Sequence, residues 1–168
     1  FCSCFSFLPT LAAVRSNTFT TLAPSTALPL FSLPPSRFAA TLLPCLFAGP
    51  ASVGRNEKQL QKAGVKYKKA YAFPMTHAGY YPGATQLTLK LLFGENGEIY
   101  GAQAAGRENV EKQIDVISAV MKLGGTVHDL AQMELCYAPP YNSAKSPVNM
   151  LGFIAENILS GLCPTTYA

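Results

Sequence analysis

Large apolar and polar residues alternate between positions 85 and 93, a period of two that predicts a β-strand. Asn96-Gly97 follows this segment, and such a pair supplies the two positive-φ positions of a tight hairpin turn. The return segment, 98–105, is rich in Gly and Ala, which suits close packing of a helix on its face. We therefore predict a β-hairpin whose first strand points four side chains to one face: Leu87, Leu89, Leu91 and Phe93.

A third alternating segment, from Lys66 to Phe73, precedes the hairpin and predicts another strand. Its charged residues alternate with aromatic or small ones, so that Tyr67, Tyr71 and Phe73 share one face. Pro74 has no backbone N–H and ends the segment.

Apolar residues at helical spacing predict further elements on both sides of these strands. A short helix covers 56–62 and is stopped by Gly64. A longer helix runs from about 108 to 123, and a short helical turn over 126–130 begins at a Thr126/Asp129 pair typical of a capping box. The apolar stripe of the longer helix is Val110, Ile114, Ile117 and Met121.

The last predicted helix has a defined start and end. Ser146 can cap it, and Pro147 suits its first position, where no backbone N–H is needed. Gly161 ends it. Its apolar stripe is Leu151, Ile154, Ala155, Ile158 and Leu159.

These elements predict an α+β fold, a small antiparallel sheet of two or three strands covered by helices, over residues 51–161. Residues 162–168 form a tail. Residues 1–50 contain seven prolines, one glycine and no periodicity, which predicts an unstructured low-complexity segment. Two interpretations of that segment remain open: an organelle transit peptide, and an incomplete or mis-joined gene model.

Charge and cysteine content exclude several classes of protein. Residues 1–56 carry three arginines and no acid, whereas residues 57–168 carry ten basic and nine acidic side chains, so the folded part is nearly neutral and implies no nucleic acid. Four prolines interrupt the long uncharged stretch between Arg15 and Arg37, which argues against a membrane span. None of the five cysteines forms a C-x-x-C pair, and we expect a reduced, cytoplasmic setting, or an organelle if the N-terminal stretch is a transit peptide.

The usual motifs for cofactors and metals are absent from the sequence. No glycine-rich nucleotide-binding loop occurs, so we expect this chain to bind neither FAD nor NAD(P)H by itself. His77 and His128 each lack a second ligand at metal-binding spacing. We do not expect a Ser143/Lys145 nucleophile pair, because nothing nearby suggests an oxyanion hole, and Cys136 has no histidine beside it to act as a base.

Two tyrosine-rich segments could carry chemistry. Glycines flank Tyr80-Tyr81 in the segment 77–83, and Pro82 stiffens the turn, so the phenols can be aimed outward. The segment 136–147 contains three prolines together with Tyr137 and further hydrogen-bonding side chains. The competing interpretation is that both are ordinary aromatic loops packed on the hairpin.

The chain resembles the C-terminal dimerisation domain of the pyridine nucleotide-disulfide oxidoreductases. The resemblance covers about residues 51–161 and is closest to the branch of coenzyme A-disulfide reductase, NADH oxidase and NADH peroxidase. It is carried in order by Val53-Gly54 with Glu57-Lys58-Gln59-Leu60, HAGYYPGATQLTLKLLF, GAQAAG, the helix containing Ile114-Asp115-Val116, and ELCYAPPYNSAKSPVNMLGFIAENIL. Two motifs within these segments, H-x-G-Y-Y-P-G and Y-A-P-P-Y-x-S-A-K, are specific in combination.

The resemblance implies a role, cofactors and partners. In that family an FAD domain and an NAD(P)H domain precede this one, and the C-terminal domain forms the homodimer, here through the hairpin and the helical face. Tyrosines of these two motifs reach the active site of the partner subunit, and they match Tyr80 or Tyr81, and Tyr137. The chain departs from the family at Cys136, where Ala is usual, and at Ser146, where Asp is usual.

Two functional hypotheses follow. The first is the dimerisation domain of an FAD-dependent NAD(P)H oxidoreductase acting on disulfides, oxygen or peroxide, present without its FAD and NAD(P)H domains and not catalytic alone. The alternative is a stand-alone structural or binding module that keeps the fold and has no redox chemistry.

Overall fold

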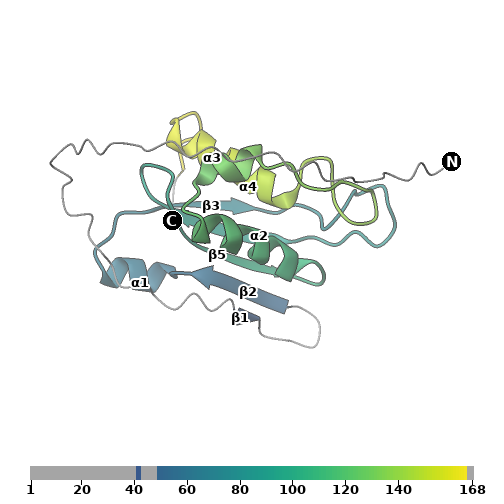
Figure 1. The fold of residues 1–168 in the computed structure, drawn as a ribbon, viewed down its shortest axis with the longest axis horizontal. Helices are drawn as coiled ribbons and strands as arrows, with labels where there is room; N and C mark the ends of the chain where they lie inside the picture. The colour runs from purple at the N-terminus through teal and green to yellow at the C-terminus, as the bar shows by residue number, and fades with distance from the viewer. Residues whose placement is uncertain (1–40, 43–48, 166–168) are drawn as a thin grey trace, which may run out of the picture. The chain divides into compact units, whose positions relative to one another are not determined.

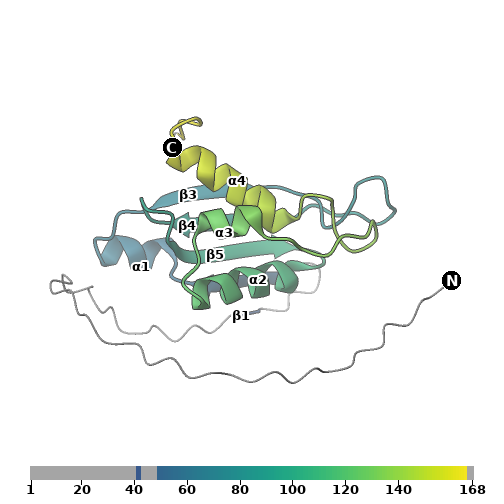
Figure 2. The ribbon, with the colours of Figure 1, turned by 45° about the horizontal axis from the view of Figure 1, so that its top comes forward.

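Helices cover one face of an antiparallel sheet in the computed structural model, which describes residues 41–42 and 49–165 of the 168-residue chain. The described part contains five strands in the order β1-β2-β5-β4-β3, and α2, α3 and α4 lie together on one face of the sheet (Figures 1 and 2). The strands are β1 (Thr41–Leu42), β2 (Gly49–Gly54), β3 (Lys68–Ala72), β4 (Thr88–Phe93) and β5 (Ile99–Gly106). The helices are α1 (Glu57–Lys62), α2 (Val110–Lys122), α3 (Val127–Gln132) and α4 (Pro147–Leu159).

The α+β class predicted from the sequence is confirmed, but the strand count is wrong. Strands β1 and β2 were not predicted, because β2 reads Gly-Pro-Ala-Ser-Val-Gly and lacks the large alternating residues that mark a strand. Ala51 and Val53 of β2 are nevertheless buried, and every residue of β2 has a partner on β5. Thr41 and Leu42 of β1, and Gly49 and Pro50 of β2, therefore belong to the sheet, whereas the rest of the predicted unstructured stretch, 1–40 and 43–48, lies outside the described residues.

The predicted hairpin is confirmed as β4 and β5, which pair antiparallel, and the four predicted inward residues of the first segment are fully buried. The turn differs from the prediction. Only Gly97 has a positive φ, 85°, and Asn96 does not. The N–H of Gly97 donates to the Gly94 carbonyl, and the N–H of Gly94 donates to the Glu98 carbonyl. The loop is longer than the two-residue turn that was predicted, and Gly97 alone takes the left-handed conformation after a turn. Asn96 therefore does not need a positive φ.

Small residues take the core side of two strands. On β3 the alternation is as predicted, but the buried side chains are Ala70 and Ala72, and Tyr71 points away from the core. On β5, Ala102 and Ala104 are buried. Short side chains at these positions let helices approach the sheet closely, while α2 and α4 supply the bulk with Ile114, Ile117 and Leu151.

The helix boundaries follow their capping residues. The Asp129 carboxylate accepts hydrogen bonds from the N–H and the hydroxyl of Thr126, at 2.6 and 2.9 Å, which confirms the capping box at α3. The start of α4 lies at Pro147 as predicted, but the buried Ser146 hydroxyl has no hydrogen-bond partner among the described residues and does not act as the cap. Instead, the proline fixes the first helical residue, and the Met150 N–H donates to the Ser146 carbonyl at 3.0 Å.

One carboxylate joins α1 to the sheet face opposite the other helices. Glu57 forms ion pairs with Lys69, at 2.9 Å, and with Lys90, and it accepts a hydrogen bond from Tyr67. The hydrogen bonds from Lys90 and then Lys69 lower the pKa of Glu57 to about 2. A group whose pKa is lowered by folding stabilises the fold above its ordinary pKa and loses that contribution as the pH falls toward its folded value.

We expect Glu57→Gln to lower the free energy of unfolding by roughly 1–2 kcal/mol at pH 7, because two ammonium groups lose their counter-charge. The difference from the unaltered chain should shrink between pH 4.5 and pH 2, where Glu57 itself becomes protonated. Urea unfolding at pH 7 and near pH 2 measures both values. Glu108→Gln, at an exposed position, is the control and should show little change at either pH.

Candidate functional site

The first tyrosine-bearing loop joins β3 to β4 and is held at its base by backbone bonds. Thr76 N–H donates to the Thr85 carbonyl, and Leu87 N–H donates to the Pro74 carbonyl, both at 2.8 Å. Within the loop, Tyr81 N–H donates to the Ala78 carbonyl at 2.9 Å and makes a turn. The loop therefore extends beyond the end of the sheet in a conformation fixed by these hydrogen bonds (Figure 2).

His77 fills the inside of this loop. Its Nδ1 lies 3.1 Å from Thr76 Oγ1 and its Nε2 lies 3.4 Å from the Pro82 carbonyl oxygen. The ring packs edge-on against Tyr81, with ring centres 5.8 Å apart. His77 is buried, and these contacts assign it a structural role in supporting the turn that carries Tyr80 and Tyr81.

The second tyrosine-bearing loop joins α3 to α4. Tyr141 and Asn142 both donate their backbone N–H to the Ala138 carbonyl, at 2.9 and 3.0 Å. The Asn142 side chain donates from Nδ2 to the Cys136 carbonyl at 3.1 Å and accepts the Ser143 N–H at 2.9 Å. Together with Pro139 and Pro140, these bonds give the loop one defined path.

The two loops meet at their tyrosines. The hydroxyls of Tyr80 and Tyr137 lie 2.8 Å apart and share a hydrogen bond, although the residues are 57 positions apart in the chain. Tyr80 is 76% exposed and Tyr137 50% exposed. A second bond, from the Ala78 N–H to the Asn142 carbonyl at 3.2 Å, joins the loops below the hydroxyl pair. The structure thus brings Tyr80 and Tyr137 together and leaves Tyr81 against His77.

The shared hydrogen bond affects the acidity of the pair. Hydrogen bonding with Tyr137 raises the pKa of Tyr80 above its ordinary value, with a smaller contribution from desolvation. Tyr80 therefore stays protonated throughout the physiological pH range. Tyr80 is an exposed hydroxyl that can donate a hydrogen bond.

Asn142 is a residue of this site that the sequence did not single out. It lies at the open position of the Y-A-P-P-Y-x-S-A-K motif and is 1% exposed. Polar residues are rarely so buried unless their hydrogen bonds are satisfied, and here both ends of the side-chain amide are bonded. A single buried Asn in a loop has no sequence signature, so only the folded loop reveals it.

Other candidate chemistry in this region is not supported. Ser143 Oγ donates to the backbone carbonyl of Lys145, and Lys145 Nζ lies 5.6 Å from the ring centre of Phe153, so the two side chains do not form a nucleophile and base. Cys136 is exposed. Within residues 41–42 and 49–165, no group of three or more His, Cys, Asp or Glu side chains could hold a metal ion. His128 instead pairs with Glu156 at 2.6 Å.

Gly101 and Gly106 of β5 do not form a cradle for a dinucleotide. A side chain built at Gly101 or Gly106 would meet Arg55 or Leu87 of this chain within 2.5 Å, so the space beside each glycine is filled by the protein itself. A pyrophosphate needs open space beside such glycines at the start of a helix. Gly101 and Gly106 therefore leave no room for a pyrophosphate, and the absence of flavin binding by this chain stays a prediction.

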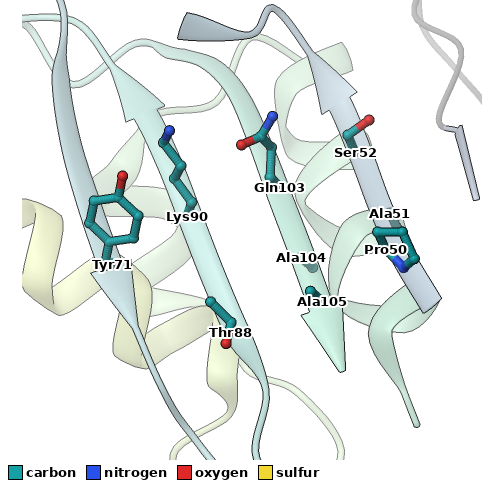
Figure 3. A pocket seen from close by; sticks show the side chains of 9 residues that line it. All are labelled: Pro50, Ala51, Ser52, Tyr71, Thr88, Lys90, Gln103, Ala104 and Ala105. Carbon is teal, nitrogen blue, oxygen red and sulfur yellow. The ribbon is translucent and has the colours of Figure 1, made fainter. Parts of the chain in front are cut away.

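A groove of about 480 Å³ lies on the sheet face opposite α2, α3 and α4 (Figure 3). Tyr71 and Lys90 flank one side of it, with Lys90 Nζ 5.5 Å from the tyrosine ring centre. Lys90 is already paired with Glu57. We assign no chemistry to this groove, which is lined by Pro50, Ala51, Ser52, Tyr71, Thr88, Lys90, Gln103, Ala104 and Ala105. Among the described helices, none is long and apolar enough to cross a membrane.

The sequence and the structure of this chain are similar to those of known proteins. Coenzyme A disulfide reductase of Staphylococcus aureus (strain bovine RF122 / ET3-1) is 39% identical over 107 residues, which are 63% of this chain and 24% of the relative. The structure of reduced CoADR-RHD of Bacillus anthracis aligns with a TM-score of 0.75 and 44% identity, over 76% of this chain and 23% of that one.

A second solved structure has a nearly equal TM-score and a lower sequence identity. The NAD-dependent persulfide reductase of A. fulgidus aligns with a TM-score of 0.74 and 34% identity, over 76% of this chain and 24% of that chain. The chain thus spans about a quarter of the length of these relatives. The family model for the pyridine nucleotide-disulphide oxidoreductase dimerisation domain matches residues 46–147, which include both tyrosine-bearing loops. The chain belongs to the dimerisation domain family of the pyridine nucleotide-disulphide oxidoreductases.

Proposed function

We propose that this chain is the dimerisation domain of an FAD-dependent NAD(P)H oxidoreductase, and that Tyr80 and Tyr137 face the active site of the partner subunit. The observation that carries the proposal is the hydroxyl pair itself. Two phenols from distant loops share a hydrogen bond at 2.8 Å on the surface, where neither is needed to fill the core. Exposed, rigidly held polar groups of this kind suit recognition of a substrate better than support of a fold.

The chemistry suited to this pair is hydrogen-bond donation to a thiolate. When a disulfide is opened by a thiolate, the departing sulfur carries a negative charge. A phenol with a raised pKa remains protonated and can stabilise that charge by donating a hydrogen bond to the departing sulfur. Of the three tyrosines considered from the sequence, Tyr80 and Tyr137 are favoured for this role over Tyr81, whose ring packs against His77.

The relatives favour a sulfur substrate over oxygen or peroxide. The first curated relative is a coenzyme A disulfide reductase, and the persulfide reductase is 34% identical to this chain. We therefore propose a disulfide or persulfide of a small thiol as the substrate class. A reduced, cytoplasmic setting belongs to the same proposal, because reversible thiol chemistry of this kind operates in reducing compartments.

The alternative of a stand-alone module without redox chemistry predicts the same fold and a different oligomer. A dimerisation domain should associate with a second copy through the hairpin and the helical face. These lie together, because Gly97 in the hairpin turn is next to Val127 of α3 and Leu159 of α4. Met150 and Phe153 add exposed apolar surface on α4.

We expect the full chain to sediment as a reversible dimer whose fraction rises with concentration, since an isolated domain retains part of the family interface. Phe153→Lys should raise the dissociation constant about tenfold or more, because it places a charge in an apolar contact. The control, Leu123→Lys, changes an exposed leucine at the end of α2. Analytical ultracentrifugation of the three proteins measures the effect. A chain that stays monomeric at all concentrations would favour the stand-alone module.

A further inference from the structure

We propose that Asn142 is a positioning residue that sets the geometry of the Tyr80–Tyr137 pair. It bonds to both tyrosine-bearing loops and is itself almost fully buried. The inference deepens the proposed function and rests on it, since the position of the phenols matters for turnover only if they serve the partner's active site.

The side chain of Asn142 closes the second loop on itself. Nδ2 donates to the carbonyl of Cys136, the residue immediately before Tyr137, and Oδ1 accepts the N–H of Ser143. One side-chain amide therefore joins the Cys136 carbonyl, before Pro139-Pro140, to the Asn142–Ser143 backbone after them. Because the carbonyl of Cys136 belongs to the peptide group that leads into Tyr137, this contact fixes the backbone from which the phenol projects.

The backbone of Asn142 ties the second loop to the first. Its carbonyl accepts the N–H of Ala78, and Ala78 in turn accepts the N–H of Tyr81 to form the turn around Tyr80. Asn142 thus bonds to Ala78, which lies two residues before Tyr80, and to Cys136, which lies one residue before Tyr137. These two hydrogen bonds are enough to fix the backbone of one phenol-bearing segment relative to the other.

Burial explains why Asn142, rather than the hydroxyl pair, holds the geometry. The hydrogen bond between Tyr80 and Tyr137 is exposed and competes with water, so its net contribution is small. Asn142 is 1% exposed, and breaking its bonds would leave buried polar groups without partners, which costs more than the loss of an exposed bond. The exposed pair is therefore a consequence of the buried clamp.

The test follows the titration of Tyr80 in the full chain by NMR, with ¹³C at the phenol carbon of tyrosine and assignment by Tyr80→Phe. In the unaltered chain Tyr80 should ionise above the ordinary pH for tyrosine, because it is bonded to Tyr137. In Asn142→Ala the titration should return to the ordinary range, as it should in Tyr137→Phe. Asn157→Ala, at an exposed position on α4, is the matched control and should leave the titration unchanged.

A merely structural role would lower the unfolding temperature of Asn142→Ala without moving the Tyr80 titration, and that result would overturn the proposal. If Asn142→Ala does not fold, hydrogen exchange in the unaltered chain still tests the proposal. The side-chain amide protons of Asn142 should exchange with solvent about tenfold or more slowly than those of Asn157, because they are buried and bonded. Equal exchange rates would also overturn the proposal.

These outcomes are separate from a failure of the proposed function. If Asn142→Ala disrupts the pair but Tyr137→Phe leaves turnover unchanged in a complete enzyme, Asn142 positions the phenols and the phenols have no catalytic role. If Asn142→Ala leaves the pair intact while Tyr137→Phe lowers turnover, the positioning proposal alone is wrong.

Discussion

Replacing Tyr137 with Phe is expected to lower kcat about 100-fold in a complete enzyme that contains this domain. A suitable enzyme is S. aureus coenzyme A disulfide reductase in which residues 49–161 of this chain replace the matching segment. The substitution removes one hydroxyl and keeps the ring, so the loop and the dimer should persist. What is lost is one hydrogen-bond donor to the departing thiolate and the hydrogen bond between Tyr137 and Tyr80. Steady-state kinetics with coenzyme A disulfide measures kcat and KM.

The matched control is Tyr141→Phe, which removes the hydroxyl of another exposed tyrosine in the same loop. It should leave kcat within about twofold of the unaltered chimera. If Tyr137→Phe unfolds the protein, or if its kcat equals that of the control, then the catalytic role of Tyr137 is wrong and only the interface role remains.

Gly152→Ala is expected to lower the free energy of unfolding by about 3 kcal/mol, the upper range for overpacking a core. Gly152 lies in α4 where it crosses α3, and a methyl group there would lie 2.5 Å from the backbone nitrogen of Ala131. The neighbouring atoms are backbone and cannot move aside as a flexible side chain would, so the two helices must separate. Asn149, one turn earlier, donates to three carbonyls at the end of α3 and would be strained by the same movement.

Thermal and urea unfolding of the full chain measure this effect. Gly79→Ala is the control, because a methyl group at Gly79 meets no atom within 4 Å and the backbone there does not require glycine. An unfolding free energy of Gly152→Ala close to that of the control would show that α3 and α4 can separate at little cost.

The sequence predicted the elements that have strong periodicity and missed those built from small residues. The alternation from Leu87 to Phe93 and the stripes of α2 and α4 are long enough to be unambiguous, and each of them is confirmed. Strand β2 was missed because its stability comes from pairing with β5, which is a long-range contact and leaves no local pattern. The same limit explains why the positive φ predicted for Asn96 was wrong, because that conformation depends on the length of the loop and not on residue type alone.

The candidate site was predictable as two segments but not as one arrangement. The Tyr-Tyr-Pro-Gly and Tyr-Ala-Pro-Pro motifs identified both loops by resemblance. Nothing in the spacing showed that Tyr80 rather than Tyr81 would meet Tyr137, because that choice depends on the turn at Ala78 and on the packing of His77 inside the loop. Asn142 could not be found at all, since its partners are backbone atoms whose positions exist only in the fold.

The edge of the sheet formed by β3 bears on how the protein avoids aggregation. An unpaired edge strand exposes N–H and carbonyl groups that another chain could extend. Strand β3 is only five residues long, begins with Lys68 and Lys69, and is followed after one residue by Pro74, which has no N–H to donate. A short edge that ends close to a proline offers few backbone hydrogen bonds to a second copy of the same strand. Growth of the sheet from one molecule to the next at this edge is therefore disfavoured, which leaves well-defined association to the surfaces formed by side chains.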